Sequence, residues 1–361
     1  MNNTTGNGTI ILFELYSSMA QIIGYSLAYG ILGSLALAGN VTVLLVVFLN
    51  KSMRTTINVL LFNLSLSDVL YILLSVPGYL STEICNQRWM LGLVMAIICQ
   101  GFAILTAASS VFTLIGIAFE RYFAIVHPLK SRTRNAKNRT TFLAIGAIWL
   151  CSAAFAAPLA IATKTIVVPL SVEENGQITV QDVTFLDTDM DVEKFKVYYT
   201  IIFIGLHVVP FVSLAIMYTR VAWKLWHPDK QLRDQSDGAG GKETALRMSE
   251  RNRRKTTIMV IAVLIAFFVC FFPFHIYYIS EIFRDDYEHE STTETSVLRV
   301  CLILNAAINP VIYNLLSQNF RSGFREIFGC CWCIKNEVNA GSVNTIQAVG
   351  NLSPYSQARY T

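Results

Sequence analysis

The sequence predicts an all-α membrane protein: a bundle of seven transmembrane helices, followed by a short amphipathic helix beside the membrane. Its composition is that of a membrane protein, because 53% of the 361 residues are apolar, 14% are charged and the mean hydropathy is +0.48. Seven windows reach the length of about 20 residues that a helix needs to cross the hydrocarbon core. They are residues 22–49, 57–81, 93–119, 140–162, 197–222, 256–282 and 297–317. Polar segments separate the windows, and the longer ones span residues 163–196 and 223–255.

The positions of Lys and Arg predict the orientation of this bundle. With the amino terminus outside, the inner loops and the tail, counted with Arg220 near the inner end of its window, hold 22 Lys and Arg against 8 Asp and Glu. The outer segments, counted with Glu281 and Arg299 near the outer ends of theirs, hold 6 against 15. Basic residues gather on the cytoplasmic side of membrane proteins, so this orientation is favoured. The expected parts are a glycosylated outer segment at residues 1–21, the membrane domain at 22–317, the amphipathic helix at 318–329 and a disordered cytoplasmic tail at 330–361. Acceptor tripeptides for N-glycosylation begin at Asn2, Asn3 and Asn7.

One carboxylate, Asp68, stands in the middle of the second apolar window with no basic partner in that segment. A carboxylate at the bilayer centre costs roughly 2.5–3.5 kcal/mol, so such a residue is by default a candidate functional site. Asn305 and Asn309 are four residues apart and share one helix face. Ser110 lies eleven residues before Arg121, which places it about 16 Å deeper in the membrane. We therefore expect these polar side chains to gather around Asp68.

The segment after the last window has the spacing of an amphipathic helix lying on the inner leaflet. Its apolar residues are Phe320, Phe324, Ile327 and Phe328, and Arg321 and Arg325 fall on the other face. Cys330, Cys331 and Cys333 follow directly and are candidate palmitoylation sites. Unmodified cytosolic thiols are the alternative.

Each of the seven windows carries its own short motif or marker residue. The third window ends in Glu120-Arg121-Tyr122, and His127-Pro128-Leu129 follows. The other motifs are Gly39-Asn40, Asn63-Leu64-Ser65-Leu66-Ser67-Asp68, Trp149, Pro210 with Tyr218, Cys270-Phe271-Phe272-Pro273 and Asn309-Pro310-Val311-Ile312-Tyr313. From Gly39 to about Cys333 the chain resembles the rhodopsin-like (class A) G-protein-coupled receptors. It looks most like their neuropeptide branch, in the neighbourhood of the galanin and allatostatin-A receptors.

The resemblance implies a plasma-membrane receptor that binds an extracellular ligand and activates a heterotrimeric G protein. It also implies a receptor kinase and arrestin as partners at the tail. The residues implied in G-protein coupling are Glu120, Arg121, Tyr122, Leu129, Tyr218 and Tyr313. Many relatives hold the arginine of the triplet with an acid at the inner end of the sixth window, but this chain has Arg253 there. That departure removes one restraint on the resting state.

The same resemblance implies an allosteric sodium ion and an aromatic switch. The ion would be held by Asp68, Ser110, Asn305 and Asn309, with Asn40 beside them; a water network without an ion is the alternative. The switch would consist of Phe267, Phe271 and Pro273. Most members have Trp where this chain has Phe271, which leaves the coupling of ligand to switch open.

The expected ligand pocket is apolar and aromatic with few polar groups, as binding pockets usually are. The residues expected to line it are Gln100, Ala103, Tyr199, Phe203, Phe274, His275, Tyr278 and Arg299. Arg299 would face the ligand, Glu281 or another nearby acid. Residues 163–196 and 281–299 together carry 13 acids against 5 bases, which favours a basic peptide. A solvated rim around a pocket for a lipid or other small apolar ligand is the alternative.

The usual disulfide at the outer face of this family is absent. Ala96 stands at the expected cysteine position, and residues 163–196 contain no Cys. A local bridge between Cys85 and Cys99 and two unpaired thiols are both open.

Two other classes of function fit less well. A transporter would use Asp68 as an ion carrier, but such proteins tend to show inverted repeats and several midplane charges. No catalytic nucleophile, metal-ligand cluster or phosphate loop stands out in the sequence, so an enzyme is not expected, and neither is a nucleic-acid partner.

Overall fold

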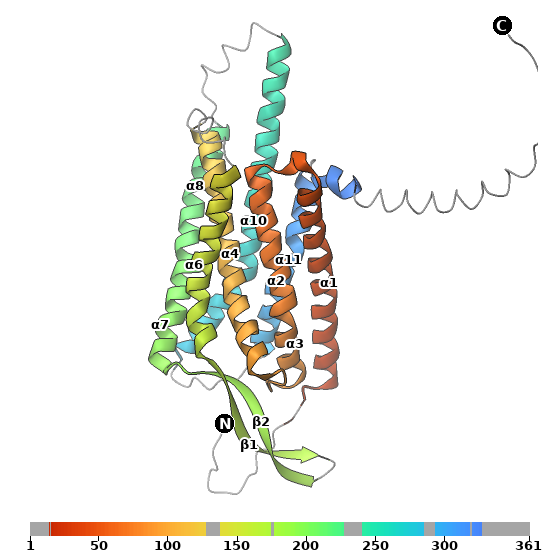
Figure 1. The fold of residues 1–361 in the computed structure, drawn as a ribbon, viewed down its shortest axis with the longest axis vertical. Coiled ribbons are helices and arrows are strands. Elements are labelled where there is room, and N and C mark those ends of the chain that lie inside the picture. Colours follow the sequence, from red (N-terminus) through yellow and green to blue (C-terminus); the bar gives the residue numbers. More distant parts are fainter. Residues whose placement is uncertain are drawn as a thin grey trace, which may run out of the picture.

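The computed structural model describes residue 14 and residues 16–127, 138–174, 177–226, 240–284, 293–317 and 320–326. Within these residues seven helical spans are long and apolar enough to cross a membrane, which confirms the predicted bundle. The helices are α1 (Met19–Leu49), α2 (Thr56–Leu74), α3 (Val76–Ile84), α4 (Gly92–Val126), α6 (Asn138–Ala162), α7 (Val192–Phe203), α8 (Val209–Trp226), α10 (Gly240–Ile282) and α11 (Thr293–Leu316). Figure 1 shows them side by side in one bundle. Asn2, Asn3, Asn7, Leu129, Cys330, Cys331 and Cys333 lie outside the described residues.

Two of the spans are interrupted rather than continuous. The second is divided at Ser75 into α2 and α3, and Pro77 lies in the first turn of α3. The fifth contains a π-helical turn, Ile204–Val208, between α7 and α8. Proline removes a backbone donor and crowds the preceding turn, so Pro77 and Pro210 account for both interruptions.

The sixth helix is longer than its apolar window. α10 begins at Gly240, whereas the predicted window began at residue 256. It extends past the other helices at one end of the bundle (Figure 1). Residues 242–255 contain no Gly or Pro, so the chain can continue as a polar helix beyond the membrane.

The segment between the fourth and fifth spans forms an antiparallel hairpin, which was not predicted. β1 (Thr163–Glu174) pairs with β2 (Gln177–Thr188) in a register that joins Thr163 to Thr188. The hairpin lies across one end of the bundle (Figure 1), which we call the hairpin end. β-Branched residues at Thr163, Thr165 and Ile166 favour strands over helix and were the missed signal.

Backbone hydrogen bonds attach this hairpin to the bundle. The amide of Trp89 donates to the carbonyl of Thr184 at 2.8 Å, and Arg88 forms an isolated bridge with Phe185. Cys85 and Cys99 are both free, so the local disulfide is not formed. Main-chain pairing therefore holds the strand where a cysteine bridge is absent.

The core centres on α4, which packs against α2, α6 and α8, while α1 packs against α2 and α11. Asn63 joins three helices, because its amide donates to Thr113 at 2.8 Å and its carbonyl accepts from the Trp149 indole at 2.9 Å. Residues 320–326 form a helical segment at the end opposite the hairpin (Figure 1). A Cβ at Gly323 would lie 2.5 Å from Val46, so only glycine allows this close approach.

Candidate functional site

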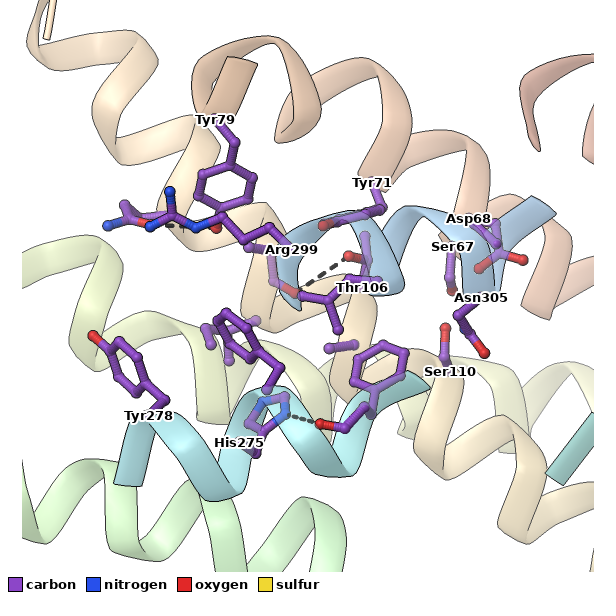
Figure 2. A pocket seen from close by; sticks show the side chains of 18 of the residues that line it. Ser67, Asp68, Tyr71, Tyr79, Thr106, Ser110, His275, Tyr278, Arg299 and Asn305 are labelled. Atoms are coloured by element: carbon purple, nitrogen blue, oxygen red, sulfur yellow. Dashed lines mark hydrogen bonds between the residues drawn. The ribbon is translucent and has the colours of Figure 1, made fainter. Parts of the chain in front are cut away.

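A cavity of about 120 Å³ lies inside the bundle, between the spans. Seven of the eight residues predicted for the ligand pocket line it: Gln100, Ala103, Tyr199, Phe274, His275, Tyr278 and Arg299. Phe203 does not, because its ring packs on His207 with a centroid separation of 6.0 Å. Figure 2 shows Tyr79 and Tyr278 toward one end of the cavity and Asp68 and Asn305 toward the other.

Sequence reasoning missed four polar residues of this cavity: Ser67, Tyr71, Tyr79 and Thr106. Tyr71 and Tyr79 follow Asp68 by three and eleven residues, a spacing that keeps them on one helix face. Thr106 precedes Ser110 by four residues and shares its face in the same way. The signal was present, since both sets continue the face of a residue already chosen.

Arg299 is held by Glu83, an acid that the sequence pattern does not connect with it. Its Nη1 lies 2.8 Å from Oε1 of Glu83, and its guanidinium stacks over the Tyr79 ring at 5.1 Å. The hydroxyl of Ser296 donates to Oε2 of the same carboxylate at 2.5 Å. Glu281, the partner suggested from the sequence, instead pairs with Arg284 at 3.1 Å. Glu83 is only 2% exposed, so Asp68 is not the only acid buried in the bundle.

Asp68 lies at the other end of the cavity and has no basic partner among the described residues. The amide of Asn309 donates to its Oδ2 at 3.0 Å. Ser110 and Asn305 line the cavity beside it (Figure 2). The expected cluster around the carboxylate is therefore present as a set of neighbouring polar groups.

Asn40 was placed in this cluster, but its amide is used elsewhere. It donates to the carbonyls of Ala36 and Ala306, each at 2.9 Å. The second of these carbonyls is the one freed by Pro310, which has no N–H to offer it. The side-chain nitrogen of Asn40 therefore joins α1 to the kinked α11, while its Oδ1 is buried without a hydrogen-bond partner among the described residues, so a place for Asn40 beside the cluster stays a prediction.

The oxygens near Asp68 suit a small hard cation. The Oδ1 atoms of Asn305 and Asn309 are buried and have no hydrogen-bond partner among the described residues. Buried polar atoms are normally paired, and oxygen donors of this kind are those that hard cations prefer. The donor set thus fits the sodium ion that the family resemblance implies.

Aromatic rings connect the cavity to the core of the bundle. Phe271 lines the cavity and stacks on Phe267, with a centroid separation of 4.3 Å. On its other side Phe271 stacks on His275 at 5.9 Å, and His275 packs against His207 at 3.8 Å. Pro273 lies inside α10, between Phe271 and His275 in the sequence. A ligand that displaces Phe271 would therefore move side chains deep in the core.

A second charged site lies at the opposite end of the bundle. Nε of Arg121 is 2.7 Å from Oε2 of the adjacent Glu120, and both side chains are partly exposed. The hydroxyls of Tyr218 and Tyr313 are buried and have no hydrogen-bond partner among the described residues. Tyr122 packs edge-on against Phe123 and His127. The side chain of Arg253 lies outside the described part of the chain.

The comparisons with known proteins identify the fold. The family described as 7 transmembrane receptor (rhodopsin family) matches residues 39–313. The chain is 30% identical over 313 residues to the allatostatin-A receptor of Bombyx mori, covering 84% of this chain and 78% of that protein. It is 28% identical to galanin receptor 2b of Danio rerio, covering 93% and 83%. It is 28% identical to the substance-P receptor of Aquarana catesbeiana, covering 92% and 76%. The chain therefore belongs to the rhodopsin family of seven-transmembrane G-protein-coupled receptors, which are multi-pass signalling receptors and not enzymes.

Proposed function

We propose that this receptor resides in the plasma membrane with the hairpin end outside, binds a short extracellular peptide and activates a heterotrimeric G protein. The relatives are named as receptors for allatostatin-A, galanin and substance P, which supports a peptide ligand. The observation that carries the proposal is the cavity, because Arg299, Phe271 and Asp68 all line it. A ligand in it can act on the switch and the polar cluster together. The receptor kinase and arrestin expected at the tail remain part of the proposal.

The charge of the rim supports a peptide with basic residues. The two segments around the mouth carry 13 acids and 5 bases. Several of these acids already have partners: Lys164 contacts Asp187 and Asp189, and Lys194 contacts Asp191 at 2.6 Å. Lys164 donates a hydrogen bond to Oδ1 of Asp189 at 3.4 Å, and this bond raises the pKa of Lys164 above its ordinary value. The attraction for a basic ligand therefore comes from the acids left in excess, among them Asp182.

A screen tests the proposal. Cells expressing the full chain are exposed to amidated synthetic peptides, including the peptides for which the relatives are named, with reporters for several G-protein classes. Activation by a basic peptide is the expected result. If only lipids or acidic compounds activate the receptor, a receptor for a small apolar ligand replaces this proposal.

The rim has its own test once an agonist is found. Asp285, Asp286 and Glu288 are neutralised together, and the association and dissociation rates of the agonist are measured. These three residues lie outside the described residues, and the expectation rests on their charge: we expect slower association with little change in dissociation, because long-range charge acts mainly on diffusional encounter. Added salt should slow the wild-type association as well, since the screening length is about 8 Å at physiological ionic strength. Unchanged association in the triple variant would mean that the rim is only a solvated surface.

We propose further that sodium binds at Asp68, Ser110, Asn305 and Asn309 in the resting receptor. The unpaired amide oxygens of Asn305 and Asn309 support this site. An ion that stabilises the resting state must weaken agonist binding by linkage. Agonist affinity in sodium and in a large organic cation of equal ionic strength checks this assignment.

A further inference from the structure

The ion pair between Glu83 and Arg299 is asymmetric with respect to the cavity. Glu83 does not line the cavity, and both of its oxygens are occupied, one by Arg299 and one by Ser296. Arg299 does line it, and only its Nη1 has a hydrogen bond among the described residues. A ligand in the cavity can therefore contact the guanidinium of Arg299 but not the carboxylate of Glu83.

The groups beside Arg299 make this part of the cavity a place for a hydrogen-bond acceptor. The hydroxyl of Tyr79 donates to the side-chain carbonyl of Gln100 at 3.4 Å, which leaves the Gln100 amide group as a donor. Arg299 also lines the cavity, and its other N–H groups have no hydrogen-bond partner among the described residues. A guanidinium has only donors, so the complementary ligand atom is a carbonyl or carboxylate oxygen.

The charge of Glu83 decides between these two acceptors. Its carboxylate is 2% exposed and already neutralises the guanidinium at 2.8 Å. A ligand carboxylate would bring a second negative charge to this neutral pair, in a cavity whose far end holds Asp68. Burying a charge without its own partner is unfavourable, whereas an uncharged carbonyl needs only hydrogen bonds.

We propose that Glu83, acting through Arg299, makes the cavity select a ligand whose buried end is an uncharged carbonyl group, such as a terminal carboxamide, over a free carboxylate. This inference rests on the proposed peptide ligand and deepens it. Glu83 is a positioning residue, because it touches Arg299 and not the ligand.

The test uses three matched pools of synthetic octapeptides with basic residues near the amino end and an aromatic residue at the carboxyl end. One pool ends in carboxamides, one in methyl esters and one in free acids. Equal mixtures are offered to the purified full-length receptor, and the bound peptides are counted by mass spectrometry. On the wild type we expect amides and esters to exceed acids by about tenfold, which equals about 1.4 kcal/mol.

Glu83→Gln leaves Arg299 without its counter-charge, so the preference should invert toward the acids. Ser296→Ala is the matched control, because it removes a contact to the same carboxylate without changing any charge; it should keep the wild-type preference. If Glu83 had only a structural role, Glu83→Gln would reduce the amount of bound peptide from all three pools to the same extent.

The outcomes separate this inference from the proposed function. If no pool is enriched on the wild type, both the peptide ligand and this inference fail. If peptides are enriched but acids equal amides, only the inference fails. If Glu83→Gln cannot be purified, the methyl ester pool on the wild-type receptor decides the question. Esters carry no charge, so if they bind as weakly as the acids, the cavity does not select by charge and the inference fails.

Discussion

Two carboxylates are buried in the second span, and the bundle satisfies them in opposite ways. Glu83 has a guanidinium at 2.8 Å and a hydroxyl at 2.5 Å, all supplied by α11. Asp68 has one amide at 3.0 Å, and no cation among the described residues. A buried charge is tolerated only with partners of this kind. The comparison shows that Glu83 is neutralised by a partner within the protein, whereas Asp68 has no charged partner among the described residues, as the proposed sodium site requires.

The largest expected effect comes from substituting Arg121, because signalling should be lost while the functions assigned to the two buried acids remain. Arg121→Ala should abolish G-protein activation in a cell reporter, since it removes the cation that pairs with Glu120 and that the family resemblance implies in coupling. Agonist binding and its sodium dependence should remain. Arg54→Ala is a control at the same end, where Arg54 donates to the Phe48 carbonyl at 2.6 Å, and it should signal. A full response from Arg121→Ala would contradict the coupling assignment.

Of these variants, one that breaks the ion pair between Glu83 and Arg299 should lower the stability of the receptor most. Glu83→Ala leaves the guanidinium without its counter-charge and should lower the free energy of unfolding by about 3 kcal/mol. Ser296→Ala removes one hydrogen bond to the same carboxylate and should cost about 1 kcal/mol. Thermal unfolding of the purified, ligand-free receptor measures both. Equal losses in the two variants would mean that the ion pair contributes nothing beyond a hydrogen bond.

Removing the other carboxylate should have a different signature. Asp68→Asn should abolish the sodium effect on agonist affinity, which we expect to be about tenfold in the wild type. It should not lower the thermal stability measured without sodium, because the variant also removes an unpaired buried charge. Ser67→Ala, next to Asp68 but bonded to Ser109 at 2.9 Å, is the control and should keep the sodium effect. A sodium effect that survives in Asp68→Asn would reduce the cluster to a water network.

The smallest expected effect concerns the hairpin at one end of the bundle (Figure 1). Because backbone bonds from Trp89 and Arg88 hold it, a reducing agent should leave agonist affinity unchanged. A radioligand binding curve with and without dithiothreitol measures this. A clear loss of affinity on reduction would reveal a disulfide that the described residues do not contain.

Much of this receptor could be predicted from its sequence. The seven spans follow from apolar length alone, since a helix is the form that satisfies its own backbone in lipid. Most of the predicted ligand-pocket residues also line the cavity, because residues such as His275 and Tyr278 lie at a fixed spacing from the family motifs. The neighbours of Asp68 followed from helical spacing.

The tertiary structure decided the partners. Glu83 and Arg299 are 216 residues apart, and their pairing depends on the depth and rotation of α3 and α11, which no local pattern records. The same holds for Asn40, which turns to Ala306, and for Phe203, which packs on His207 outside the cavity. The sequence by itself determined which segments cross the membrane, because burial of apolar length is a property of each segment alone. Only the packed bundle determined which buried charge is neutralised and which is left open, because a side chain's partner is set by the helix that lies beside it.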